Sequence, residues 1–185
     1  GVYFGHDVRE KEKLNWESKL QKMKMCIEQW SKRKISMVGR IMVVKTFVIS
    51  KVAYLASAIE CPATYVKQIN QMIYNFVWQG KRDKVKRLTM IKNREEGGLK
   101  MMDFRLQEKA LKVMMLKRLF TGGEENWKIL PKYFFHETGS NNLLLHLNSI
   151  PDPYILNTMK VPPFYMQLVK SWYACKEDKH YDVTS

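Results

Sequence analysis

The stretch Trp30-Ser-Lys-Arg-Lys-Ile-Ser-Met-Val-Gly-Arg40 decides the fold, because it joins two segments whose apolar residues recur at helical spacing. Trp30 ends the apolar stripe of the first segment, and Ser36 is a suitable N-cap for the second. Between them, Ser31 to Lys34 are all polar, and three of these residues are cationic. A helix N-terminus beside a cationic cluster favours phosphate. The stretch therefore predicts two helices joined by a short basic turn that attracts an anion.

The segments on either side of this turn predict long amphipathic helices. We expect the first helix from about Lys11 to Arg33 and the second from Ser36 to about Ile59. The predicted core stripes are Trp16, Leu20, Met23, Ile27 and Trp30 in the first helix, and Ile41, Val44, Val48, Val52, Leu55 and Ile59 in the second.

Two cations and an aromatic ring are predicted to lie together on the second helix. Arg40 and Lys51 are eleven residues apart, so at about 100° per residue they lie almost on one line of a continuous helix. Phe47 lies close to the same line, although a purely structural role explains it equally well. Long basic side chains at the flank of a buried face reach outward to solvent.

The rest of the sequence predicts a mainly α fold, a helical bundle with a short N-terminal strand and an irregular, aromatic-rich helical tail. The expected elements are a strand at Gly1–Phe4, a helix at Thr64–Trp78 after Cys61-Pro62, an extended segment at Arg87–Ile91, a glycine turn at Glu95–Leu99, a helix from Asp103 to Phe120 and a tail helix at Phe164–Ala174. The predicted faces are Val66, Ile69, Ile73, Phe76 and Val77 on the third helix, and Leu106, Ala110, Val113, Met114 and Lys117 on the fourth.

Positive charge is concentrated in the first two-thirds of the chain. The 185 residues carry a formal net charge of +14; residues 1–120 hold 26 Lys and Arg against 11 Asp and Glu, and residues 121–185 hold 6 against 7. We therefore expect a basic helical domain at 1–122 and a neutral connecting segment, rich in aromatics and proline, at 123–185. An excess of this size indicates a polyanionic partner, although a merely solvated basic surface is the alternative.

The candidate nucleic-acid-binding residues are the cations of the junction, of the second helix and of the dense basic run at 81–87. They are Lys32, Arg33, Lys34, Arg40, Lys45, Lys51, Lys81, Arg82, Lys84, Lys86 and Arg87. Lysine and arginine side chains at such density neutralise backbone phosphates and read no sequence.

Several other classes of function are disfavoured by the sequence. Cys26, Cys61 and Cys175 are far apart, which argues for a reducing intracellular setting and against a disulfide framework or structural zinc. Cys175 with His180 does not complete a metal site, and we expect no cofactor. Three cations interrupt the apolar stretch Met37–Ile59, which therefore predicts a buried helix and no membrane span.

Catalytic motifs are also missing from the sequence. It contains no Gly-x-Ser-x-Gly, no phosphate-binding glycine loop ending in Lys-Ser/Thr and no His-Glu-x-x-His. Two-metal phosphoryl transfer needs converging carboxylates, but the aspartates never form a pair. The acidic pairs Glu95-Glu96 and Glu124-Glu125 lie in glycine-flanked turns. We expect this chain alone to be no enzyme.

The pattern Trp30-x-x-Arg33-x-Ile-Ser36-x-x-Gly39-Arg40 resembles the start of the segment that follows the catalytic domain in LINE-type non-LTR retrotransposon reverse transcriptases. The opening Gly1-Val-Tyr-Phe-Gly resembles the strand after the primer grip of that family. Further elements follow in the family's order: Lys45-Thr-Phe-Val-Ile-Ser-Lys51, Ala53-Tyr54-Leu55, Cys61-Pro62, Phe76-Val77-Trp78-x-Gly80-Lys81, Gly97-Gly98-Leu99 with Asp103, Ala110-Leu111-Lys112, and Pro163-Phe164-Tyr165 with Trp172.

The resemblance implies the thumb and connecting region of such an RNA-directed DNA polymerase, which grips the template–primer duplex. The palm and fingers, with the catalytic aspartates, would precede Gly1, and they are the expected partners together with an RNA–DNA hybrid or duplex bound without sequence preference. Family members act at chromosomal targets, so the resemblance implies a nuclear setting, with cytoplasmic as the other intracellular option. The alternatives are a helical protein-interaction scaffold and a host-recruited or degenerate remnant.

Overall fold

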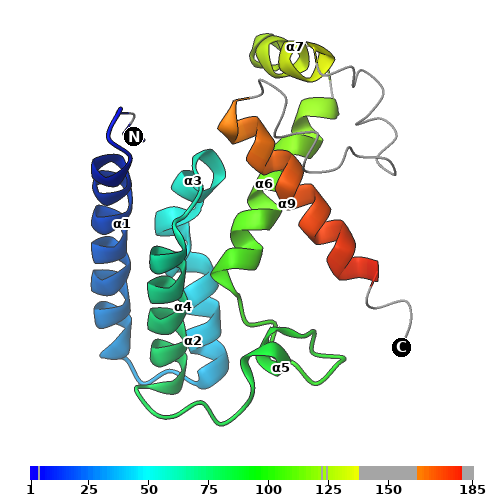
Figure 1. Ribbon diagram of the computed structural model, residues 1–185. Coiled ribbons are helices and arrows are strands. Elements are labelled where there is room, and N and C mark those ends of the chain that lie inside the picture. Colours follow the sequence, from blue (N-terminus) through cyan, green and yellow to red (C-terminus); the bar gives the residue numbers. More distant parts are fainter. Residues whose placement is uncertain (4, 122, 124, 138–161, 181–185) are drawn as a thin grey trace. The chain divides into compact units, whose positions relative to one another are not determined.

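The computed structural model describes residues 1–3, 5–121, 123, 125–137 and 162–180 (Figure 1). Regular structure within these ranges is helical, which confirms the predicted mainly α class. The chain forms two compact units, Gly1–Glu108 and Lys109–Ser185, here called the first and second units. The domain boundary after residue 122 was drawn from composition and stays a prediction.

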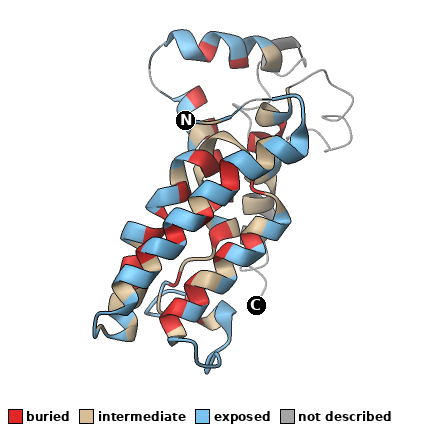
Figure 2. Cartoon of the chain, turned by 90° about the vertical axis from the view of Figure 1, so that its left-hand side faces the viewer, coloured by how far each residue is buried: buried red, intermediate tan, exposed pale blue. Residues whose placement is uncertain are grey.

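The first unit is a small helical bundle. Its helix α4 packs against both α1 and α2, while α3 and the π-helix η1 contact α1. In Figure 2, buried and exposed residues alternate around the helices, as expected for amphipathic helices on one core. The elements are α1 (Val8–Ser31), α2 (Met37–Val43), η1 (Val44–Val48), α3 (Ser50–Ala58), α4 (Ala63–Trp78), α5 (Arg87–Ile91) and the start of α6 (Phe104–Phe120).

The predicted strand at the N-terminus is wrong for residues 1–3, which have no regular secondary structure, and residue 4 lies outside the described residues. The buried side-chain amide of Asn15, on α1, pairs with the Tyr3 backbone instead. It accepts from the Tyr3 N–H at 2.8 Å and donates to the Tyr3 carbonyl at 3.0 Å. An amide side chain thus satisfies the backbone groups that a neighbouring strand would have satisfied.

The second predicted helix is divided into α2, η1 and α3, and its two halves are bent by 49°. Ser36 caps its start as predicted, because its hydroxyl accepts from the Gly39 N–H at 3.1 Å. The Ile49 N–H reaches back five residues to the Val44 carbonyl at 3.0 Å, which is the π-helical pattern. Five of the seven residues at 43–49 are β-branched, which disfavours a regular α-helix here.

The core of this broken helix follows the predicted stripe except at its end. Five residues of the stripe are buried, whereas Ile59 is half-buried. No single described helix is long and apolar enough to cross a membrane, although the bent pair Met37–Val48 and Ser50–Ala58 passes on length and composition. The buried residues of the stripe are Ile41, Val44, Val48, Val52 and Leu55.

Helix α4 has the predicted face, since all five of its predicted core residues are buried. It ends where Gln79 and Gly80 adopt positive φ angles of 54° and 72°. The chain then enters residues 81–87, here called the basic loop, all of which are exposed.

The extended segment predicted after the basic loop is wrong, because Arg87–Ile91 forms the short helix α5. The helical turn buries Met90, whose carbonyl accepts from the N–H groups of Leu99 and Met101 at 3.1 and 2.8 Å. The predicted glycine turn is confirmed by Gly97, which has a φ angle of 78°. This turn folds the chain back onto α5.

Helix α6 begins as predicted but presents a different face to the core. The Asp103 carboxylate caps it by accepting from the N–H groups of Arg105 and Leu106 at 2.8 and 3.2 Å. The predicted apolar face is wrong: Leu106 and Met114 are exposed, and Glu108 is buried. Burial of Glu108 is possible because its carboxylate accepts from the Cys61 N–H at 2.7 Å and pairs with Arg105 at 2.9 Å.

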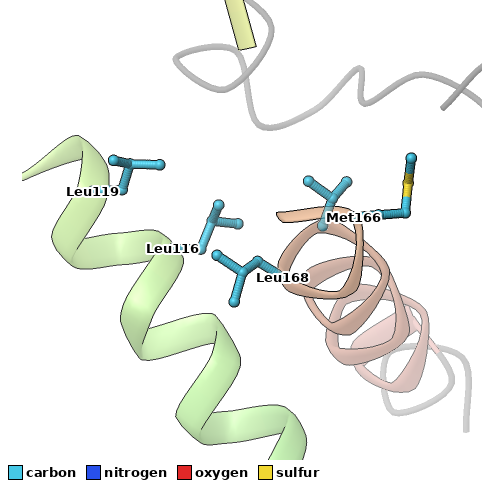
Figure 3. Close-up of a cluster of buried hydrophobic side chains, with 5 residues drawn as sticks. Leu116, Leu119, Met166 and Leu168 are labelled. Carbon is cyan, nitrogen blue, oxygen red and sulfur yellow. The ribbon is translucent and has the colours of Figure 1, made fainter. Parts of the chain in front are cut away.

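The second unit packs α6 against α9 (Pro163–His180), which contains the predicted tail helix Phe164–Ala174. Leu116 and Leu168 face each other in the close-up of its apolar cluster (Figure 3). The 3₁₀ helix η2 (Asn126–Lys128) precedes α7 (Ile129–Glu137). Lys128 at its end is buried and donates to the Thr121 and Gly123 carbonyls at 2.8 Å each. Tyr154, an aromatic residue of the connecting segment predicted at 123–185, lies outside the described residues.

Candidate nucleic-acid interface

All the predicted contact residues lie in the first unit, which holds 22 Lys and Arg against 11 Asp and Glu, a net charge of +11. Nine of the eleven are exposed, and Arg40 and Lys45 are half-buried. Within the described residues, Arg87 is the one of these cations that forms an ion pair with a carboxylate. Most of this charge is therefore accessible and not neutralised internally.

The junction turn, residues 32–36, holds its cations between two helix ends. Lys32 is the C-cap of α1, and the Arg33 N–H donates to the Trp30 carbonyl at 3.1 Å. The Ile35 N–H then donates to the Arg33 carbonyl at 3.0 Å, just before Ser36 caps α2. Cations at the C-terminal end of α1 are favoured by its dipole, so the fold stabilises them in this position.

Arg40 has a structural role that its sequence position did not reveal. Its Nε donates to the Val77 carbonyl at 2.8 Å, and its Nη1 donates to the Ile35 carbonyl at 2.7 Å. The guanidinium thereby ties the start of α2 to the last turn of α4. The predicted alignment of Arg40 with Lys51 is wrong, because the helix between them is bent and contains the π-helical turn.

Lys45, on η1, lies in the field of two cations that the sequence reasoning missed. Its pKa is lowered from the usual value by partial burial first, then by the positive charges of Lys100 and Arg94. Arg94 and Lys100 flank the glycine turn. A turn in the sequence indicates that the chain reverses direction, and this was the one signal that these two cations could lie near Lys45. An anion near these three cations would relieve their mutual repulsion.

The basic loop is anchored at its end by Arg87. Its guanidinium pairs with Asp83 at 2.9 Å and lies 4.3 Å from the centre of the Tyr74 ring. Lys81, Asp83 and Arg87 also line a groove of about 540 Å³ with residues of α1 and α4. The remaining cations of the basic loop are exposed and have no such anchor among the described residues: Lys81, Arg82, Lys84 and Lys86.

No protein-family model matches the chain. In the part of the chain that the structure describes, no group of three or more His, Cys, Asp and Glu side chains is placed to hold a metal ion. The geometry and charge of the first unit are therefore the features of this chain that bear on its function.

Proposed function

We propose that the first unit binds nucleic-acid duplexes through their backbone phosphates, without sequence preference. The observation that carries the proposal is the set of exposed cations on the junction turn, α3 and the basic loop, only one of which is paired with a carboxylate, with the half-buried Lys45 on η1 beside them. Accessible cations on several elements of one compact helical unit suit the spaced negative charges of a phosphate backbone.

The proposal includes a more specific role, taken from the resemblance to LINE-type reverse transcriptases. In that role the chain is the duplex-gripping thumb and connecting region of a polymerase and performs no chemistry itself. An RNA–DNA hybrid is A-like, so recognition would depend on shape, phosphates and 2′-hydroxyl groups. Two donors of the Arg40 guanidinium already bind backbone carbonyls. In this role Arg40 therefore supports duplex binding indirectly, by fixing α2 to α4.

A salt titration of binding to a short RNA–DNA hybrid tests the proposal, with duplex DNA and single strands of equal length beside it. If roughly six to eight phosphates are neutralised, log K falls against log salt with a slope of about −5 to −7. A preference for the hybrid would support the thumb role. Binding that is absent or insensitive to salt would contradict duplex binding altogether.

The second candidate is a protein-interaction scaffold formed by the second unit. Its support is the outward side of α7, where Ile129 and Tyr133 are 67% and 56% exposed. Phe164 and Trp172 pack against the apolar cluster of this unit, whereas Trp127 stays partly exposed. Salt-insensitive binding in the titration above would favour this candidate.

A further inference from the structure

Phe47 is an exposed aromatic ring held in a fixed position. It lies on η1 with 47% of its surface exposed, and its ring centre is 5.1 Å from that of Trp30, with the planes tilted by 33°. Trp30 is the last aromatic residue of α1, so this contact joins the end of α1 to the π-helical turn.

The same indole also holds a cation. The guanidinium carbon of Arg33 lies 4.5 Å from the centre of the Trp30 ring, within the range of a cation–π contact. Trp30, Arg33 and Phe47 therefore form one continuous group of contacting side chains, here called the platform. Its geometry is set by the junction turn and η1 and does not depend on a flexible loop.

The surroundings of the platform are strongly cationic. From Gln29 to Ile59 the sequence contains six Lys and Arg and no Asp or Glu. Lys51 is exposed and follows Phe47 by four residues, with Ile49 between them in a right-handed helical conformation. An anionic ligand is the complement of this surface, and an acidic ligand with planar rings suits it best.

The exposed ring distinguishes between paired and unpaired nucleic acid. Bases inside a duplex are stacked on both faces, so a protein ring can stack only on an unpaired or terminal base. Aromatic side chains beside a basic track are the usual means of binding single strands without sequence preference. The platform therefore adds a capacity that the phosphate contacts of the proposed function do not provide.

We propose that the platform is a single-strand site, in which an unpaired nucleobase stacks on Phe47 while Lys51 and the junction-turn cations contact the flanking phosphates. The site rests on the proposed function, because it lies on the same nucleic-acid-binding unit. It extends that function from the duplex to a single-stranded segment adjoining the duplex.

The test compares two ligands of equal charge by fluorescence anisotropy on the full chain. Both are RNA–DNA hybrids with a short single-stranded overhang, and in one the overhang carries abasic sites in place of bases. The wild-type chain is expected to bind the overhang with bases about 5- to 150-fold more tightly, the range for one stacked base. This comparison requires no variant protein.

Two substitutions locate the effect on the platform. Phe47→Leu keeps an apolar contact with Trp30 but removes the ring, so the preference for bases should disappear, while Phe47→Trp should retain it. Tyr54→Leu is the matched control, because Tyr54 is an exposed aromatic residue of the same carboxylate-free stretch, on α3. The control should leave the preference unchanged.

The outcomes separate the two proposals. Equal affinity for both ligands in the wild type, or a preference for bases that survives Phe47→Leu, overturns the proposal of a single-strand site on the platform. If both ligands still bind with a steep salt dependence, the duplex proposal stands. An equal loss of preference in Tyr54→Leu also overturns the platform. Absence of salt-dependent binding to either ligand overturns both proposals.

Discussion

Tyr74 is a buried tyrosine whose hydroxyl has no hydrogen-bond partner among the described residues. Burial is the main cause that raises its pKa to about 12; Asp103 adds to the rise, and Arg87 above the ring opposes it. A buried hydroxyl without a partner is destabilising by about 1–3 kcal/mol. Replacing Tyr74 by Phe keeps the ring under Arg87, so the variant is expected to be more stable by about 1 kcal/mol in thermal melts at neutral pH.

The same residue predicts a loss of stability at high pH. An unfolded tyrosine ionises near pH 10, whereas folded Tyr74 keeps its proton to about pH 12. The part of the free energy of unfolding that depends on protonated Tyr74 is therefore fully present below pH 10. It is lost as the pH rises toward 12. Denaturant melts across this range should show a steeper decline for the wild type than for Tyr74→Phe. Parallel declines in the two proteins would contradict the raised pKa.

Arg40 shows what could and could not be predicted about a single residue. Its charge and its place at the start of a helix were evident from the sequence, and both suggested a phosphate contact. Its two carbonyl partners were not evident, because Val77 is 37 residues away along the chain. Long-range hydrogen bonds of this kind depend on how helices pack, and helical spacing alone does not determine packing.

Helices with a strong periodic pattern were the elements best predicted from the sequence. The face of α4 and the caps at Ser36 and Asp103 are confirmed, because apolar spacing and short polar side chains act locally. The π-helical turn, the short helix α5 and the buried face of α6 were missed. The buried face of α6 depends on a distant partner, because Glu108 is buried through its bond to the Cys61 N–H, 47 residues away along the chain.

The turn between α5 and α6 carries a prediction of its own. Gly98 is buried, and a Cβ atom there would overlap the Lys92 carbonyl oxygen, whereas a Cβ at Gly97 meets nothing within 4 Å. Gly98→Ala is expected to destabilise the chain by more than about 2 kcal/mol, because backbone atoms have to move. Gly97→Ala is the matched control, with a loss of about 1–2 kcal/mol from its positive φ angle alone. Denaturant melts measure both values, and equal losses would contradict the steric argument.

The uneven charge of the whole molecule was visible in the sequence, but its distribution over two compact units was not. Composition changes after residue 122 and the compact units divide after Glu108, within α6, and the domain boundary drawn from composition stays a prediction. A long helix contributes to both units, and composition does not record which residues pack together. The excess of positive charge nevertheless belongs mainly to the first unit, at +11 of the +14.

This distribution distinguishes a localised interface from general attraction by net charge. One double variant, Lys81→Gln with Lys84→Gln, neutralises two exposed cations of the basic loop; the other, Lys117→Gln with Arg118→Gln, neutralises two exposed cations of α6 in the second unit. Both lower the net charge from +14 by the same two units. The loop variant is expected to reduce the steepness of the salt dependence by about 2, since each neutralised phosphate contributes about 0.9. The α6 variant should leave the slope unchanged, because its cations lie outside the proposed interface. Equal slopes for the two variants in the hybrid titration would mean that net charge alone governs binding, and the interface on the first unit would have to be abandoned.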